Sequence, residues 1–177
     1  MSSTEKLLEQ VLILRCQLRD KDAFAELIER YQKPLRYFIN RLLSNSELAE
    51  EAFQETWLTV IRQICSLRKP ETFAAWLYRI AHSRVYQELR RKKLLSNLNE
   101  NLPAANVTED DSDLFEDIEK LHRCLDKLRP EHKEVLMLRF LEQMSHEQIA
   151  DVIDCNPGTV KSRIYYAKLA LKKEMEK

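Results

Sequence analysis

Glycine is almost missing from this sequence: Gly158 is the only one among 177 residues, whereas an average globular chain of this length carries about a dozen. Proline is also scarce, with five residues. Residues that favour helices, such as Leu, Ala, Glu, Lys and Arg, are abundant instead. Because the alternating pattern of β-strands is also missing, the sequence predicts an all-α fold.

Other absences exclude whole classes of protein. No run approaches the ~20 apolar residues of a membrane span, and the amino-terminal segment lacks the features of a signal peptide. The four cysteines are far apart without a CxxC pair, so we expect buried, reduced thiols and no metal site. A Gly-rich phosphate loop is absent, and the histidines have no ligand spacing. The sequence predicts a cytoplasmic protein that inserts in no membrane, needs no cofactor, acts on no small-molecule substrate and is not an enzyme.

Charge and periodicity divide the chain into three parts. From Lys21 onward apolar residues recur at helical spacing, and Ser46 is the predicted N-cap of one of the helices. We interpret residues 1–94 as a domain of three to four helices. Residues 95–113 are polar, acidic and without period, and are predicted to form a flexible linker. Helical spacing returns over residues 114–177, the second small helical domain, whose last helix is strongly basic.

The basic end of the chain predicts a helix-turn-helix. Ser145 and Gln148 have the spacing of a capping box, and Asn156 followed by Pro157 is a typical start for the next helix. Such a second helix enters the major groove of DNA, with base contacts near its amino end and phosphate contacts further along. We expect Gly158 to avoid a collision with the preceding helix or with the DNA backbone.

The segment LRPEHKEVLMLRFLEQMSHEQIADVIDCNPGTVKSRIYYAKLALKKEM resembles region 4 of the extracytoplasmic-function (ECF) sigma factors of bacterial RNA polymerase. Similar helix-turn-helix units occur in response regulators, so this half alone does not distinguish the two classes. The amino-terminal half resembles region 2 of the same sigma factors in the segments KDAFAELIERYQKPLRYFINRLL, AEEAFQETWLTVIRQI and FAAWLYRIAHSRVYQELRRKK. The two resemblances together cover about residues 20–94 and 114–175, in the order of the family.

The resemblance implies a promoter-specificity subunit that binds core RNA polymerase and promoter DNA and is held inactive by an anti-sigma factor. It assigns three sets of residues. The polymerase-binding set is Glu51, Gln54, Glu55, Leu58 and Arg62. The −10 element set is Trp76, Arg79, Ser83, Tyr86, Gln87, Arg90 and Arg91. The −35 element set is Gly158, Thr159, Lys161, Ser162, Arg163, Tyr166 and Lys168.

The residues themselves agree with these sets and leave some alternatives open. Tyr86 lies between cations at helical spacing, a pattern that suits stacking on a single-stranded base. Trp76 could either stack on a base in the same way or belong to the hydrophobic core. Ser83 and Gln87 stand where the family usually has Asn and Asp, so the promoter preference is open. Two other functions remain: a helix-turn-helix regulator that works without polymerase, and a sigma mimic that sequesters an anti-sigma factor.

Overall fold

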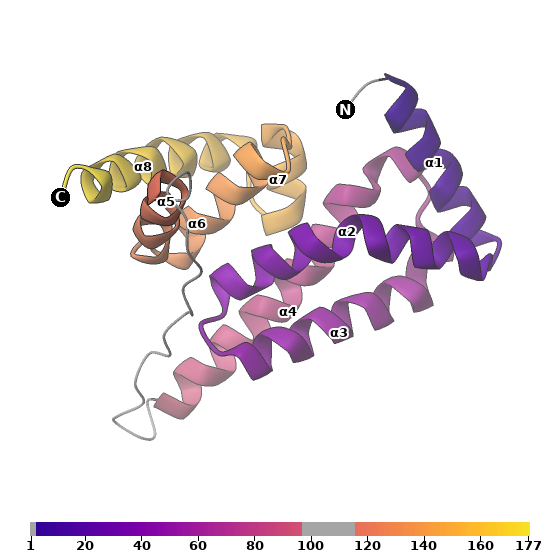
Figure 1. The fold of residues 1–177 in the computed structure, drawn as a ribbon, viewed down its shortest axis with the longest axis horizontal. Coiled ribbons are helices and arrows are strands. Elements are labelled where there is room, and N and C mark those ends of the chain that lie inside the picture. Colours follow the sequence, from indigo (N-terminus) through magenta and orange to yellow (C-terminus); the bar gives the residue numbers. More distant parts are fainter. Residues whose placement is uncertain (1–2, 97–115) are drawn as a thin grey trace.

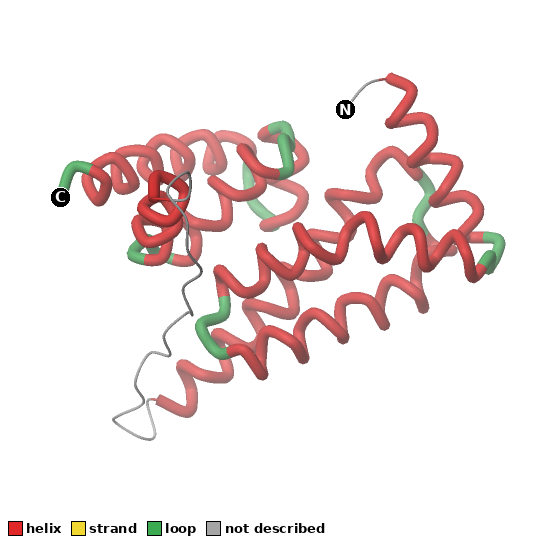
Figure 2. Tube along the Cα trace, viewed as in Figure 1, coloured by secondary structure: helices red, strands yellow, loops and turns green. Residues whose placement is uncertain are grey.

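The computed structural model describes residues 3–96 and 116–177, and these two ranges contain helices and connecting turns but no strand (Figures 1 and 2). The first range, here called the N-terminal unit, contains α1 (Ser3–Gln17), α2 (Lys21–Leu42), α3 (Ser46–Gln63) and α4 (Phe73–Ser96). Two 3₁₀ turns, Ile64–Ser66 and Pro70–Thr72, connect α3 to α4. The predicted all-α class is confirmed.

The second range, here called the C-terminal unit, contains four α-helices and one π-helical turn. They are α5 (Glu116–Asp126), α6 (Pro130–Leu136), the π-helical turn Met137–Leu141, α7 (His146–Ile153) and α8 (Pro157–Met175). The predicted acidic linker, residues 95–113, lies outside the described residues except for its first two positions, where α4 continues.

The apolar stripe that the sequence places on α2 forms the centre of the N-terminal unit. Leu27, Leu35 and Phe38 are almost completely buried, and α2 packs against both α3 and α4. Pro34 lies within this stripe, and the helix continues through it without a break. The Phe38 ring meets Tyr78 of α4 edge to face, with 5.0 Å between ring centroids, a preferred geometry for aromatic pairs.

Several local predictions need correction. The N-cap of α3 is Asn45, not Ser46, and its side chain accepts a hydrogen bond from the Leu48 amide at 2.8 Å. The periodicity did not indicate α1, because α1 has apolar residues on its exposed side as well as on its buried one. The cysteines are free, but they are not all buried, since Cys65 is exposed.

The two units pack directly on each other. α4 lies against α7, and α2 lies against α6 (Figure 1). The buried apolar residues of both units form one contiguous cluster. Across the described parts of the chain, each helix falls short of the length and apolar character that a membrane crossing requires.

Candidate polymerase and nucleic-acid interfaces

The outer side of α3 carries the residues predicted to bind core polymerase. Gln54, Leu58 and Arg62 are exposed along this side, as is Glu51, and Glu55 is half-buried. The Leu58 side chain is 42% exposed, and its neighbours on the helix surface are the polar residues Gln54, Glu55 and Arg62 and the exposed Ile61. Because apolar surface of this kind gains free energy when a partner covers it, this side of α3 is suited to a protein contact.

Two arginines hold the acidic part of this surface in place. Arg84 of α4 donates a hydrogen bond to the Thr59 hydroxyl at 3.1 Å and lies 3.9 Å from the Glu55 carboxylate. From the sequence alone, Arg84 could pair with an acid or reach DNA, and in the structure it lies beside the acid. Arg36 of α2 pairs with Glu50, whose pKa is lowered mainly by a hydrogen bond from Gln54 and then by this arginine.

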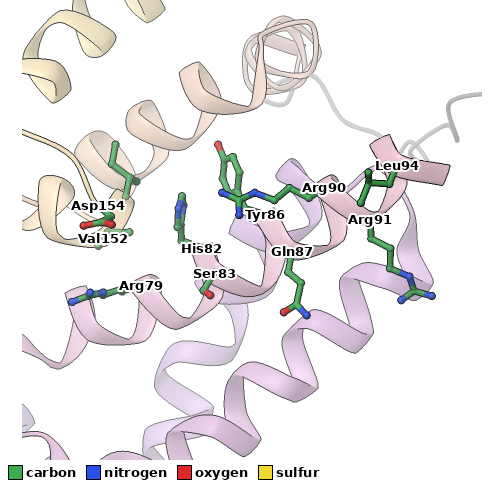
Figure 3. A pocket seen from close by; sticks show the side chains of 11 residues that line it. Arg79, His82, Ser83, Tyr86, Gln87, Arg90, Arg91, Leu94, Val152 and Asp154 are labelled. Atoms are coloured by element: carbon green, nitrogen blue, oxygen red, sulfur yellow. The ribbon is translucent and has the colours of Figure 1, made fainter. Parts of the chain in front are cut away.

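The basic side of α4 lines an open groove of about 930 Å³ between the two units (Figure 3). Arg79, Ser83, Gln87 and Arg90 are exposed along it. Arg91 also lines the groove and lies 3.5 Å from the Glu88 carboxylate. The far wall is supplied by α7 and its end, with Val152, Ile153 and Asp154.

Trp76 is separate from the groove. Its side chain is half-buried and packs on the core, with its ring 6.0 Å from that of Phe73, centroid to centroid. Of the predicted −10 set, the structure therefore groups six residues along the groove and leaves Trp76 against the core.

His82 and Tyr86 project from α4 in another direction from Ser83 and Gln87 (Figure 3). The Tyr86 hydroxyl donates a hydrogen bond to Glu134 Oε2 of α6 at 3.0 Å. His82 Nδ1 lies 2.6 Å from the other carboxylate oxygen of Glu134. Burial raises the pKa of the Tyr86 phenol, and the Glu134 charge raises it further. Tyr86 is thus held by the C-terminal unit rather than left open to stack on a base.

The predicted helix-turn-helix is present as α7 and α8. Ser145 and Gln148 form both hydrogen bonds of a capping box at the start of α7. Asp154 ends α7 in the left-handed conformation, with φ 50° and ψ 58°. The Asp154 and Cys155 amides both donate to the Ala150 carbonyl, which satisfies an orphan acceptor at the helix end. Asn156 occupies the N-cap position of α8 as predicted, but its side chain forms no capping hydrogen bond.

The outer side of α8 presents most of the predicted −35 set. Gly158, Lys161, Ser162, Tyr166 and Lys168 are exposed, while Thr159 and Arg163 are half-buried. The Ser162 hydroxyl donates to the Thr159 carbonyl at 2.9 Å. Lys168 lies over the exposed Phe140 ring, with Nζ 4.8 Å from the centroid. Inward-facing Val160, Ile164 and Ala167 fix this orientation.

Gly158 does not avoid a clash within the protein. A Cβ atom built at this position would meet nothing within 4 Å, and the glycine does not have a positive φ. The part of the prediction that placed the preceding helix there is therefore wrong, and only the approach of DNA remains as a reason. The residue that needs the left-handed conformation in this motif is Asp154.

The residues that join the two units were not identified by the sequence analysis. Glu134 of α6 is 1% exposed, and its acidic type suggests a surface position. Only its spacing could have indicated that Glu134 is buried. It lies four residues before the buried Leu138, and residues four apart lie on the same side of a helix. Arg41 of α2 and Asp126 of α5, 2.7 Å apart, form a second link between the units.

Comparison with known proteins agrees with both halves of this description. Residues 27–94 match the family described as sigma-70 region 2, and residues 118–171 match sigma-70 region 4. The chain is 31% identical to the ECF RNA polymerase sigma-E factor of Haemophilus influenzae, over 97% of this chain and 97% of the relative. It is 30% identical to the RNA polymerase sigma-H factor of Pseudomonas aeruginosa, over 95% of this chain and 94% of that protein.

Solved structures show the same fold. The sigma factor RpoE of Bartonella quintana, crystallised with the anti-sigma factor NepR, superposes with a TM-score of 0.76 and 22% identity, over 86% of this chain and 96% of that chain. CnrH, solved in complex with the cytosolic domain of CnrY, gives a TM-score of 0.68 and 19% identity, over 95% of this chain and 97% of its own. With both sigma regions present in order and near-complete alignment to curated relatives, the chain belongs to the ECF group of RNA polymerase sigma factors.

Proposed function

We propose that this protein is an alternative sigma factor that directs core RNA polymerase to a specific class of promoters. The observation that carries the proposal is the order of two sigma regions in one chain, each with an exposed side of the expected chemistry. Region 2 supplies the α3 surface and the basic groove of α4, and region 4 supplies the outer side of α8. The protein has no catalytic step of its own and acts in the cytoplasm, where its polymerase and promoters are.

Each surface has a separate role in this proposal. The outer side of α3, centred on Leu58, binds core polymerase. The exposed groove residues of α4 bind the −10 element, where the arginines contact phosphates. Tyr86 stacks on a base only after its hydroxyl has left Glu134. The amino-terminal half of α8 contacts bases of the −35 element in the major groove, and Lys161 and Lys168 contact phosphates.

An anti-sigma factor is the expected regulator. The similar RpoE of Bartonella quintana was solved with the anti-sigma factor NepR, and CnrH was solved with the cytosolic domain of CnrY. A protein that covers either the α3 surface or the α4 groove would prevent promoter recognition. We therefore expect this chain to bind an anti-sigma factor through these surfaces.

Direct binding to core polymerase tests the proposal. Fluorescently labelled protein is titrated with bacterial core RNA polymerase, and the Leu58→Asp variant is compared with Leu18→Asp. Leu18 is a suitable control because it is an 81% exposed leucine that directly follows α1 and does not belong to the set predicted to bind polymerase. The proposal predicts binding that Leu58→Asp weakens by about tenfold or more, while Leu18→Asp binds as the unaltered protein does.

Two other outcomes would assign a different function. Duplex DNA binding without affinity for core polymerase would identify a regulator that works without polymerase. Tight core binding that never yields transcripts would identify a sigma mimic. Either result would contradict the proposal.

A further inference from the structure

α1 exposes a row of apolar side chains on the side that faces away from the N-terminal core. Its inner side packs against α2 and the two 3₁₀ turns, and Leu12, Ile13 and Cys16 are buried there. Figure 1 shows α1 at the outer edge of the N-terminal unit, at the opposite end of the molecule from α5. The row, here called the α1 stripe, consists of side chains with large exposed fractions: Leu7 (61%), Leu8 (62%), Val11 (47%), Leu14 (49%) and Leu18 (81%).

Four members of the α1 stripe have the spacing of a contact between two helices. Positions 7, 11, 14 and 18 are separated by four, three and four residues, which is the a/d pattern of helices packed side by side. Leu18 directly follows α1, but its amide donates a hydrogen bond to the Leu14 carbonyl at 3.1 Å, so the helical turn continues to this residue. The stripe is therefore a straight apolar line along the outer side of the helix.

The size of the α1 stripe is that of a small interface. Its five members together expose as much surface as about three whole residues of this type. That places the stripe among the largest apolar patches of typical monomers, about 300–600 Å². Two such stripes in contact bury about 1,000 Å², which is the lower limit for a specific interface. The area is therefore sufficient for a reversible dimer and too small for a permanent one.

The order of the stripe fits a second copy of the same helix. The separations of four, three and four residues are the same in both directions along α1. Two antiparallel copies therefore place Val11 opposite Leu14 of the partner subunit, and Leu7 opposite Leu18 of the partner subunit. A twofold axis relates the copies in such a contact, and twofold dimers are the commonest assemblies of identical chains.

The charges around the stripe favour a protein partner over a membrane. The charged residues from Glu5 to Asp22 are four acids and four bases, so this part of the chain has no net charge. A helix that lies on an anionic membrane has instead a polar side rich in Lys and Arg. Arg15, at the edge of the stripe, is already paired, at 2.7 Å from Asp20 and 3.7 Å from Glu26. Two copies can thus approach each other without net repulsion.

We propose that the α1 stripe is a self-association surface, at which two copies of this chain pair through antiparallel α1 helices. The dimer forms at micromolar concentrations and dissociates at nanomolar ones, because the buried area is at the lower limit for a specific interface. No residue of the stripe belongs to the polymerase, −10 or −35 sets. The inference is therefore independent of the proposed function.

Sedimentation velocity of the full chain, from about 1 µM to about 200 µM, tests the proposal by mass action. Val11→Glu and Leu14→Glu each place a charge at the centre of the stripe, and circular dichroism verifies that helicity is unchanged. Leu141→Glu is the matched control, because Leu141 is 55% exposed in the π-helical turn and lies outside the stripe. We expect a monomer–dimer equilibrium whose dissociation constant rises about tenfold or more in each α1 variant and stays unchanged in Leu141→Glu.

Disulfide crosslinking tests the orientation of the two helices. Cys65, which is exposed, and Cys155, which is half-buried, are first replaced by serine. Val11→Cys and Leu14→Cys are then prepared as separate proteins, one with a size tag, mixed, and oxidised in air. Antiparallel pairing predicts that the mixed disulfide forms fastest, because these two positions face each other within disulfide reach. Faster formation of the two unmixed disulfides would show parallel helices and contradict the proposed arrangement.

Three results would overturn the inference. The unaltered chain could remain monomeric throughout the concentration range. A dimer could form that Leu141→Glu dissociates and Leu14→Glu does not. The monomer could instead bind vesicles of phosphatidylglycerol and lose that binding in Leu14→Glu, which would show that a membrane covers the stripe. Core polymerase binding is measured at nanomolar protein, where the chain is monomeric, so failure there concerns the proposed function alone and Leu18→Asp remains a valid control.

Discussion

The rings of Tyr37 in α2 and His122 in α5 lie 5.6 Å apart, centroid to centroid, across the boundary between the two units. Burial lowers the pKa of His122 below its usual value, and the charge of Arg41 lowers it further, while Asp126 and Glu119 act in the opposite direction. The folded protein therefore holds this proton less tightly than the unfolded chain does. Stability from this group is fully present above about pH 6.5, the ordinary pKa of histidine, and falls as the pH is lowered through that value.

We expect the free energy of unfolding to fall between pH 7.5 and pH 5.5, and the His122→Phe variant to show a smaller fall. Phenylalanine keeps a ring against Tyr37 but takes no proton. Urea titrations at several pH values measure both proteins. An equal fall in the two proteins would show that His122 is not the group responsible.

The contribution of Glu142 to stability should change with pH in the opposite direction to that of His122. Burial raises the pKa of this carboxyl group, and the Tyr78 hydroxyl, which forms no hydrogen bond of normal geometry with any described residue, partly offsets that effect. A raised pKa means that the contribution to stability is present below the unfolded value of about 4.5 and is lost as the pH rises through the folded pKa. Glu142→Gln should therefore raise the melting temperature at pH 7, with a gain that shrinks toward pH 4.

Glu147→Gln is the matched control for that substitution. Glu147 is an exposed acid in the first turn of α7, and its pKa is lowered by hydrogen bonds from its own amide and from Ser145. Its neutral replacement should lower the melting temperature at pH 7, because a carboxylate with a lowered pKa stabilises the folded protein at that pH. A gain from Glu147→Gln as large as that from Glu142→Gln would mean that burial of Glu142 is not the cause.

Asp154 offers a stabilising substitution in the turn of the helix-turn-helix. Its left-handed backbone costs about 1 kcal/mol or more for a residue with a Cβ, and glycine adopts this conformation without that cost. Asp154→Gly should raise the free energy of unfolding by about 0.5–1 kcal/mol. Asp151→Gly, within α7, should lower it by about the same amount. Chemical denaturation of both variants measures the two effects, and a loss of stability in Asp154→Gly would contradict this view of the turn.

Substitutions at Gly158 should affect helix stability and DNA binding differently. Because a Cβ here has open space, Gly158→Ala should stabilise α8 by up to about 1 kcal/mol. Gly158→Leu should keep helicity near normal and weaken binding to duplex DNA carrying the −35 element in the presence of core polymerase. Unchanged affinity in Gly158→Leu would exclude a close approach of the DNA backbone at this position.

The sequence was sufficient where local rules decide the structure. The capping box of Ser145 and Gln148 and the apolar stripe of α2 follow from spacing alone, and both are present. It failed at α1, where Leu7, Val11 and Leu14 are exposed on one side while Leu12 and Ile13 are buried on the other. Because apolar residues occur on both sides of this helix, they show no helical spacing from which α1 could be predicted.

Contacts between the units could not be predicted, because they depend on how two folded pieces meet. Glu134 looks like a surface residue next to Lys133, yet α4 buries both its oxygens in hydrogen bonds. The sequence predicted that Tyr86 is exposed and free to stack on a base. In the structure, its hydroxyl donates a hydrogen bond to Glu134 instead. The polymerase, −10 and −35 sets remain predictions for individual residues, and the variants above test them.

Run-off transcription tests the central claim most directly. The pure protein is mixed with bacterial core RNA polymerase and genomic promoter fragments, and each component is also assayed alone. The account predicts transcripts only when protein and core are both present, from start sites that share one pair of upstream elements. Absence of transcripts, together with DNA binding that does not depend on core polymerase, would contradict it.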